Sequence, residues 1–296
     1  MSLYSIQQQG LAVINALVIV MATSLIAVSL LEKQSQQTER LIAEQERSQA
    51  VWLLRGGLDW VQQLLQIEGR RSPITTTSGV LAQRLQNLTI EAIEGTESAL
   101  FSGYIEDEQS KFNLLRLVSA QAIDSQQVAQ LEQLFMWIDL PQTLAKAFAQ
   151  QLLGSYQTSS HSPSQLAGRR PTELAAAASL SSEQRTRLNQ YCTLLPPQTK
   201  LNINTASAEV LAASIPTLSL AEATQLVRDR DQGNWFMSTS QFLQRLPSAE
   251  HDTLKKVELK SQWFVVHGEI QRGATHVRQQ ALLHRQSNQT SIVWVQ

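Results

Sequence analysis

The longest hydrophobic run of the chain lies near its N-terminus, at residues 11–31. It reads LAVINALVIVMATSLIAVSLL and holds no charged side chain. Because a helix rises about 1.5 Å per residue, roughly 20 apolar residues can cross the roughly 30 Å hydrocarbon core of a bilayer. The hydroxyls of Thr23, Ser24 and Ser29 can bond to carbonyls of the same helix. The pattern therefore predicts one membrane-spanning helix.

A charged, helix-prone segment follows at once, at residues 32–68. It lacks proline, is rich in Glu, Gln, Arg, Leu and Ala, and repeats its apolar residues at helical spacing. The pair Gly56 and Gly57 weakens this helix without ending it, whereas GRRSP at residues 69–73 ends it. Residues 11–68 are thus predicted to form one helix of about 87 Å, half in a membrane and half packed on a soluble domain.

The rest of the chain alternates between helix and strand patterns. GYIED at residues 103–107 predicts a short strand, and FNL at residues 112–114 predicts a turn back. Two helical regions, separated by a polar loop at residues 156–164, are expected at residues 124–153 and 172–195. Alternating apolar residues near the C-terminus predict an antiparallel meander of three strands, at residues 264–270, 277–284 and 292–295.

Ten uncharged residues, MSLYSIQQQG, precede the apolar run. A secretory signal peptide would have a basic start, a shorter apolar core and a small-residue cleavage site after it, and none of these is present. A plain membrane anchor fits the length but leaves Gly10 without a role. A leader of the type IV pilin kind, cut after a glycine that precedes the retained helix, accounts for both features and is favoured.

Residues 201–246 read as two short helices, a turn and a third helix, with Thr205 or Ser207 as a cap. This unit resembles a helix-hairpin-helix module, which in other proteins holds a DNA phosphate on the backbone of a glycine-containing hairpin. The hairpin here, residues 214–219, has no glycine, and Arg228 and Arg230 alternate with aspartates. We therefore favour a structural hairpin, and membrane-tethered DNA binding is the alternative function.

Other candidate chemistry is sparse. Glu106, Asp107 and Glu108 could act as acid–base carboxylates or calcium ligands, but a solvated strand end is the favoured interpretation. The histidines lack metal-ligand spacing, and no nucleophile or phosphate-loop motif is present, so no enzyme is predicted. The net charge of −1 argues against nucleic acid as a partner. A single cysteine, Cys192, excludes an internal disulfide.

Several of these segments, in this order, resemble the K-class minor pseudopilins of the type II secretion system, also called general secretion pathway protein K. The resemblance begins at Gly10 with its apolar helix. It continues at five further segments that span almost the whole chain, namely residues 102–107, 112–114, 137–139, 171–174 and 201–206.

The resemblance implies an α+β, type IV pilin-like fold. A long N-terminal helix, membrane-spanning in its first half, would pack on a small antiparallel sheet, and a large all-helical domain would be inserted. The expected units are a prepilin leader at 1–10, a transmembrane helix at 11–31, the periplasmic half of the helix at 32–68, the first part of the α/β domain at 74–118, the insert at 119–250 and the C-terminal strands at 251–296.

The resemblance also implies a function. Such proteins cap or initiate a periplasmic pseudopilus that helps export folded proteins across the outer membrane. The expected partners are the minor pseudopilins of the I, J and H classes, the major pseudopilin, the inner-membrane secretion platform and the prepilin peptidase. That peptidase would cut between Gly10 and Leu11 and methylate the amine of Leu11. The protein would be a single-pass inner-membrane protein with a periplasmic domain, although Lys33 and Arg40, which follow the span, lean weakly towards a cytoplasmic one.

Most pilins carry glutamate at the fifth mature position, whereas the K class does not, and here that position is Asn15. A glutamate buried in a fibre needs a partner such as a neighbour's N-terminal amine. A subunit with nothing above it receives no such amine, so neutral Asn15 fits a fibre tip. The alternative is a tolerated polar residue in a spanning helix.

The resemblance further implies calcium binding in an acidic loop after residues 137–139. Residues 140–164 contain no Asp or Glu, which argues against calcium there. No cofactor is therefore predicted, and the sequence leaves metal binding undecided.

Overall fold

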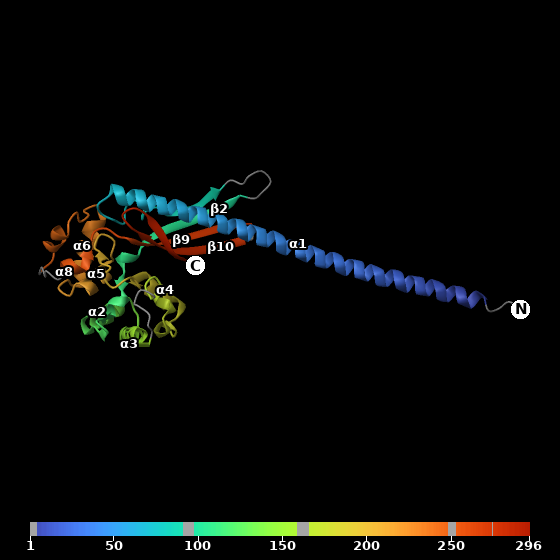
Figure 1. Cartoon of the computed structure of the whole chain (residues 1–296), viewed down its shortest axis with the longest axis horizontal. Helices are drawn as coiled ribbons and strands as arrows, with labels where there is room; N and C mark the ends of the chain where they lie inside the picture. The colour runs from blue at the N-terminus through green and yellow to red at the C-terminus, as the bar shows by residue number, and fades with distance from the viewer. Residues whose placement is uncertain (1–4, 91–97, 159–165, 248–252, 274) are drawn as a thin grey trace.

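The computed structural model describes residues 5–90, 98–158, 166–247, 253–273 and 275–296, with side chains from Val13 onward. Its dominant element is the helix α1 (Ser5–Arg71), which is 67 residues long and therefore about 100 Å. Figure 1 shows α1 projecting far beyond the rest of the protein, which is gathered around its C-terminal end. The predicted single helix is confirmed, and it begins earlier than expected, at Ser5. It ends shortly before Pro73, with Arg70 and Arg71 in its last turn.

The end of α1 lies on a five-stranded sheet of order β1-β2-β9-β10-β11, in which all neighbours are antiparallel. The predicted C-terminal meander is confirmed as β9, β10 and β11. No pattern predicted β1, because this edge strand is mostly exposed and lacks regular alternation. The strands are β1 (Leu85–Ile90), β2 (Ala99–Asp107), β9 (Trp263–Arg272), β10 (Thr275–Arg285) and β11 (Thr290–Val295).

Close packing of α1 on this sheet depends on Gly268. Gly103 of β2 and Gly268 of β9 lie opposite each other, and a Cβ atom on Gly268 would come within 2.9 Å of Leu54 Cδ2. The buried face of α1 has helical spacing and meets the apolar side chains of the central strands. That face consists of Ala50, Leu54, Leu58, Val61 and Leu65.

The chain leaves the sheet after Asp107 and returns to it at Trp263, so a large segment is inserted between β2 and β9. This insert has its own buried core, which includes Phe112 to Val118. The insert is mainly helical but not all-helical as expected, because it also contains three short two-stranded pairings. Its helices are η1 (Glu108–Ser110), η2 (Leu114–Leu117), α2 (Ser125–Trp137), α3 (Thr143–Thr158), η4 (Pro171–Glu173), η5 (Ala175–Ala177), α4 (Ser182–Tyr191), α5 (Ala208–Ser214), α6 (Leu220–Asp231), α7 (Thr239–Leu243) and α8 (Thr253–Lys256).

The short pairings correct one prediction. The turn back expected at residues 112–114 does not form a hairpin with β2. Instead β3 (Phe112–Asn113) pairs in parallel with β6 (Cys192–Thr193), about 80 residues away. The other two pairings join β4 (Val118–Ser119) to β5 (Ala122–Ile123) and β7 (Leu201–Asn202) to β8 (Val257–Glu258).

The single helix predicted at residues 172–195 is also wrong. Only α4 is α-helical there, and it starts after a capping box on Ser181. The alanine-rich stretch before it forms short 3₁₀ turns instead, and Arg185 donates to the carbonyls of Ala178 and Leu180. The side chain thus satisfies carbonyls that a continuous helix would have bonded. Of the loop predicted at residues 156–164, residues 156–158 belong to α3 and the others lie outside the described residues.

Candidate functional site

The first half of α1 has no cover within the protein. Every residue from 13 to 45 is exposed, including the apolar ones. The Thr23 hydroxyl donates to the carbonyls of Ile19 and Val20, and Ser29 donates to Ile26, so these hydroxyls are satisfied within the helix as expected. Among the described residues, α1 is the one helix long and apolar enough to cross a membrane. It fits a single-pass membrane anchor.

The predicted processing residues lie within this helix. Gly10 and Leu11 belong to the helical backbone of α1, but their side chains lie outside the described part of the chain. Cleavage between them stays a prediction. Asn15 is exposed on the same helix, and its side chain has no hydrogen bond to any described residue. Its exposed amide can bond to another molecule.

The second half of α1 carries a further apolar stripe opposite the face that meets the sheet. Its largest members are Trp52, which is 74% exposed, and Trp60, which is 52% exposed. At 100° per residue these side chains point away from Leu54 and Leu58. We call this surface the outer stripe, and it consists of Leu41, Ile42, Trp52, Trp60 and Ile67. The polar residues 32–40 separate it from the apolar run of the first half of α1.

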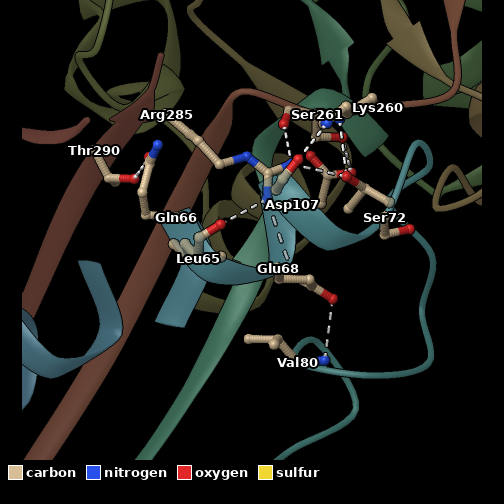
Figure 2. A network of polar contacts seen from close by, with 12 residues as sticks. Leu65, Gln66, Glu68, Ser72, Val80, Asp107, Lys260, Ser261, Arg285 and Thr290 are labelled. Atoms are coloured by element: carbon tan, nitrogen blue, oxygen red, sulfur yellow. Dashed lines mark hydrogen bonds and ion pairs between the residues drawn. The ribbon is translucent and has the colours of Figure 1, made fainter. Parts of the chain in front are cut away.

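The position of α1 on the domain is set by a buried arginine. Arg285, at the end of β10, is 5% exposed. Its guanidinium donates to the Leu65 carbonyl of α1 at 3.0 Å, to Thr75 Oγ1 at 3.0 Å and to the Ser261 carbonyl at 2.6 Å. Figure 2 shows this side chain lying between the end of α1 and Ser261, with Glu68 of α1 4.0 Å away. The helix, the sheet and the entrance to β9 are therefore joined at one point.

Asp107 extends this network into the insert. It ends β2, is 5% exposed, and accepts hydrogen bonds from the side chains of Asn202, Thr205 and Ser261 and from the Gln109 amide. Burial raises the pKa of Asp107, and these donors oppose the rise. Asn202 also donates to the Thr75 carbonyl at 3.1 Å. The carboxylate thus joins the sheet to the segment at residues 201–205.

The solvated strand end predicted at residues 106–108 is therefore wrong. Asp107 and Glu108 are both buried, and Glu108 accepts hydrogen bonds from Lys111 at 2.5 Å and from Thr193 Oγ1 at 2.6 Å. Burial tends to raise the pKa of Glu106, but His267 and Lys111 outweigh it and lower that pKa to about 2. These carboxylates are bound to other groups of the protein, because the insert folds over the end of the strand.

Arg230 of the hairpin unit is likewise held within the fold. Arg230 is 3% exposed and donates to the carbonyls of Ile203 and Ala206 at 2.9 and 2.7 Å. A guanidinium held in this way does not reach a phosphate. Ser207 is the cap of α5, and Asn204 exchanges two 2.9 Å hydrogen bonds with the backbone of Phe236. The sequence did not reveal that Asn204 joins the start of the hairpin unit to Phe236.

Metal binding finds no support in the described ranges. No group of three or more His, Cys, Asp or Glu side chains there is placed to hold an ion. The part of the expected calcium loop at residues 159–164 lies outside the described residues. Cys192 is buried beside the insert core, and burial raises the pKa of its thiol above the usual range.

Three comparisons with known proteins agree with this architecture. The family described as type II secretion system (T2SS), protein K, matches residues 201–265, which include Asn202, Asn204 and Ser261. A type II secretion system protein K from Pectobacterium carotovorum subsp. carotovorum is 24% identical over 328 aligned positions, which cover 97% of this chain and 95% of that protein. The resemblance seen in the sequence is confirmed by both.

The fold is matched by a solved structure. It is the GspK-GspI-GspJ complex of the type 2 secretion system of enterotoxigenic Escherichia coli. One of its chains aligns with a TM-score of 0.60 and 18% identity, over 87% of this chain and 98% of that chain. The expected pilin-like fold, a long helix on an antiparallel sheet with an insert, is thereby confirmed.

Proposed function

We propose that this protein is a minor pseudopilin of the type II secretion system. It caps or initiates the periplasmic pseudopilus that helps export folded proteins across the outer membrane. The proposal depends on one observation about α1. Its N-terminal apolar part has no cover within the protein, whereas its C-terminal part packs on the sheet. A helix that is apolar on all sides is stable in lipid or among similar helices. One element thus serves as a membrane anchor and as a fibre core.

The proposal places the protein in the inner membrane as a single-pass protein with its folded domain in the periplasm. The role is structural and not enzymatic. Its supports are the carboxylates at residues 106–108, which are bound by other side chains of the protein, and the similarity to proteins of this secretion system. Calcium is no part of the proposal, because residues 140–164 contain no carboxylate.

Processing at Gly10 is the first test. We expect the membrane-extracted protein to begin at Leu11 and to carry an N-methyl group, measured by intact-mass and peptide mass spectrometry. Gly10→Val should retain the leader, because a side chain there obstructs close approach of a peptidase to the backbone. The matched control, Gln9→Ala, should be processed normally. An intact Met1 in the unmutated protein, or cleavage beyond residue 31, would refute this part of the proposal.

Asn15 supports a place at the fibre tip. A carboxylate in its place would lie in the membrane without a subunit above to supply an amine. We therefore expect Asn15→Glu to reduce assembly and secretion, and Asn15→Gln to retain both. Secretion of a native cargo, with the amount of inserted protein held equal, is the measurement. Equal secretion by the two variants would remove the argument for the tip.

The proposed partners are the I- and J-class minor pseudopilins, with the H class, the major pseudopilin and the secretion platform beyond them. The outer stripe is the proposed contact surface for their helices. Replacing both Trp52 and Trp60 by alanine should leave folding intact, because both side chains are exposed, and should reduce co-purification of I- and J-class proteins from detergent extracts. Met237→Ala is the control, since Met237 is 61% exposed on the insert. Unchanged co-purification with the double variant would exclude the stripe.

A further inference from the structure

The face of the sheet opposite α1 carries a polar groove. Two adjoining hollows of about 550 and about 110 Å³ share His267 of β9 and Gln280 of β10, which are paired in the sheet. The larger hollow is bordered by β1, and the smaller one by the insert at residues 168–171. The total lies within the usual range for ligand sites. We call the two hollows together the polar groove.

An arginine stacked on an aromatic ring marks each end of the groove. The Arg84 guanidinium lies 4.9 Å from the centre of the Tyr104 ring, and Tyr104 stacks on His267 at 4.3 Å. In the smaller hollow, Arg170 lies 5.5 Å from the centre of the Trp294 indole. Stacking uses the face of a guanidinium and leaves the N–H donors at its edge free. Both arginines are thus held in place with their donors available.

The charges around the groove are not balanced. The carboxylates that line it are already paired, since Glu106 and Glu108 lie 3.3 and 2.5 Å from Lys111, and Glu269 lies 3.2 Å from Arg278. The side chains of Arg84 and Arg170, by contrast, have no hydrogen bond or ion pair to any described residue. Arginine is suited to bidentate recognition of carboxylates. The groove therefore offers two carboxylate-binding groups that no described residue uses.

Two residues of the smaller hollow also carry buried polar atoms without a hydrogen-bond partner among the described residues. Arg170 Nε and Asn189 Oδ1 are both inaccessible to solvent and have no hydrogen-bond partner among the described residues. One is a donor and the other an acceptor, which suits a ligand carrying both kinds of group, as a peptide does. Amide and hydroxyl side chains that also suit peptide groups line the larger hollow, namely Gln86, Asn87, Ser102 and Gln280.

Other anionic ligands fit this groove less well. A sugar ring would need a free aromatic face, but Tyr104 has Arg84 near one face and His267 stacked on its ring. A nucleic acid would bring several phosphates close to Glu106 and Glu269, and the chain has a net charge of −1. An extended polypeptide can instead present single carboxylates at the two arginines.

We propose that the polar groove binds an extended, acidic segment of another polypeptide, whose carboxylates are held by Arg84 and Arg170. This role is separate from fibre assembly, because the groove and the outer stripe share no residue. Loss of peptide binding would leave assembly through α1 intact, and loss of assembly would leave peptide binding intact.

The test uses the full-length protein in detergent micelles and a fluorescein-labelled peptide of alternating glutamate and serine, titrated by fluorescence anisotropy. We expect saturable binding that weakens with added salt, and weak or no binding of the matched glutamine–serine peptide. Arg84→Gln and Arg170→Gln should each reduce the affinity by roughly tenfold, as expected for losing a charge-assisted hydrogen bond. Arg47→Gln, at an exposed arginine of α1, should not.

Two further variants distinguish a loss of binding from a loss of the fold. Arg84→Lys keeps the positive charge but loses the planar donors, so its affinity should be intermediate. The double variant Arg84→Glu with Arg170→Glu should prefer a lysine–serine peptide, which an unfolded protein would not do. Circular dichroism melting monitors the fold of each. Equal affinity for the glutamate and glutamine peptides, unchanged affinity in both arginine variants, or stronger binding of an anionic glycan fragment or duplex DNA than of the peptide would overturn the proposal.

Discussion

Replacement of Arg285 by methionine tests how α1 is attached to the folded domain. Methionine retains an unbranched apolar stem of similar length and therefore keeps the contact with Phe264, whose ring centre lies 4.8 Å from the guanidinium. It removes the donors to Leu65, Thr75 and Ser261. The substitution therefore isolates the polar part of the attachment.

The expected cost follows from these contacts. A hydrogen bond to a charged group is worth about 1.5–3 kcal/mol, and losses within one network are not additive. Removing one partner of a buried charged network costs about 3–5 kcal/mol. We expect a loss in this range, because the carbonyls of Leu65 and Ser261 and the carboxylate of Glu68 remain buried. The loss would be a large fraction of the free energy that stabilises a domain of this size.

Urea unfolding of the full chain in detergent, followed by near-ultraviolet circular dichroism, measures this loss. The midpoint should fall by at least about 1 M, given the usual dependence of stability on urea. Amide hydrogen exchange at residues 66–72 should accelerate as well, because the end of α1 loses its anchor. Arg278→Gln is the control on the same strand. Its side chain is 73% exposed and pairs only with Glu269, so it should cost at most about 1 kcal/mol.

A fall for Arg285→Met no larger than that for Arg278→Gln would refute this reasoning. It would mean that apolar packing of α1 on the sheet holds the helix without Arg285.

Three further outcomes are expected. Asn204→Ala should cost about 1–3 kcal/mol, because the Phe236 backbone loses both of its buried partners. Burial raises the pKa of Glu258 from 4.5 to about 7. The contribution of Glu258 to stability is therefore full below pH 4.5 and is lost as the pH rises to about 7. Glu258→Gln should remove this pH dependence of the stability. Gly103→Ala should destabilise the protein by about 1–3 kcal/mol, because its Cβ would lie 2.9 Å from the His267 carbonyl. Gly56→Ala is the control; it has open space around it and should stabilise the helix by about 0.5–1 kcal/mol.

The same urea measurements, repeated between pH 4.5 and 7.5 for the titration, check all three. An unchanged midpoint in Asn204→Ala would show that the Phe236 backbone finds other partners. The same pH dependence with and without Glu258 would assign the titration to another group. If Gly103→Ala proved as stable as the unmutated chain, the pairing of β2 with β9 beside the His267 carbonyl would not depend on that glycine.

Much of the secondary structure was accessible from local patterns. The helix α1 was predicted because its apolar residues recur at helical spacing over a long stretch without proline. The meander of β9 to β11 was predicted because its strands alternate regularly. The edge strand β1 was missed because water faces most of it, and the helix predicted at residues 172–195 was broken by side-chain bonds to its carbonyls.

The polar junction could not be predicted in the same way. The acidic run at residues 106–108 favours a solvated strand end, whereas in the protein Asp107 is buried by segments near residues 202 and 261. Asn202 and Asn204 were recognised as parts of a distinctive motif without a physical role. Their roles became visible only through the groups that they bond.

The sequence by itself determined the uncharged apolar run at residues 11–31 and the long helix that contains it, because each depends on residues close together in the chain. The leader ending at Gly10 stays a prediction from the same residues. Only the tertiary structure decided which charges are buried and which are free. The guanidinium of Arg285 reaches a carbonyl 220 residues away, and Asp107 reaches an amide 95 residues away. Arg230 is bound within the fold, whereas Arg84 lies in the groove with its donors available. This difference depends on distant partners and cannot be predicted from local periodicity.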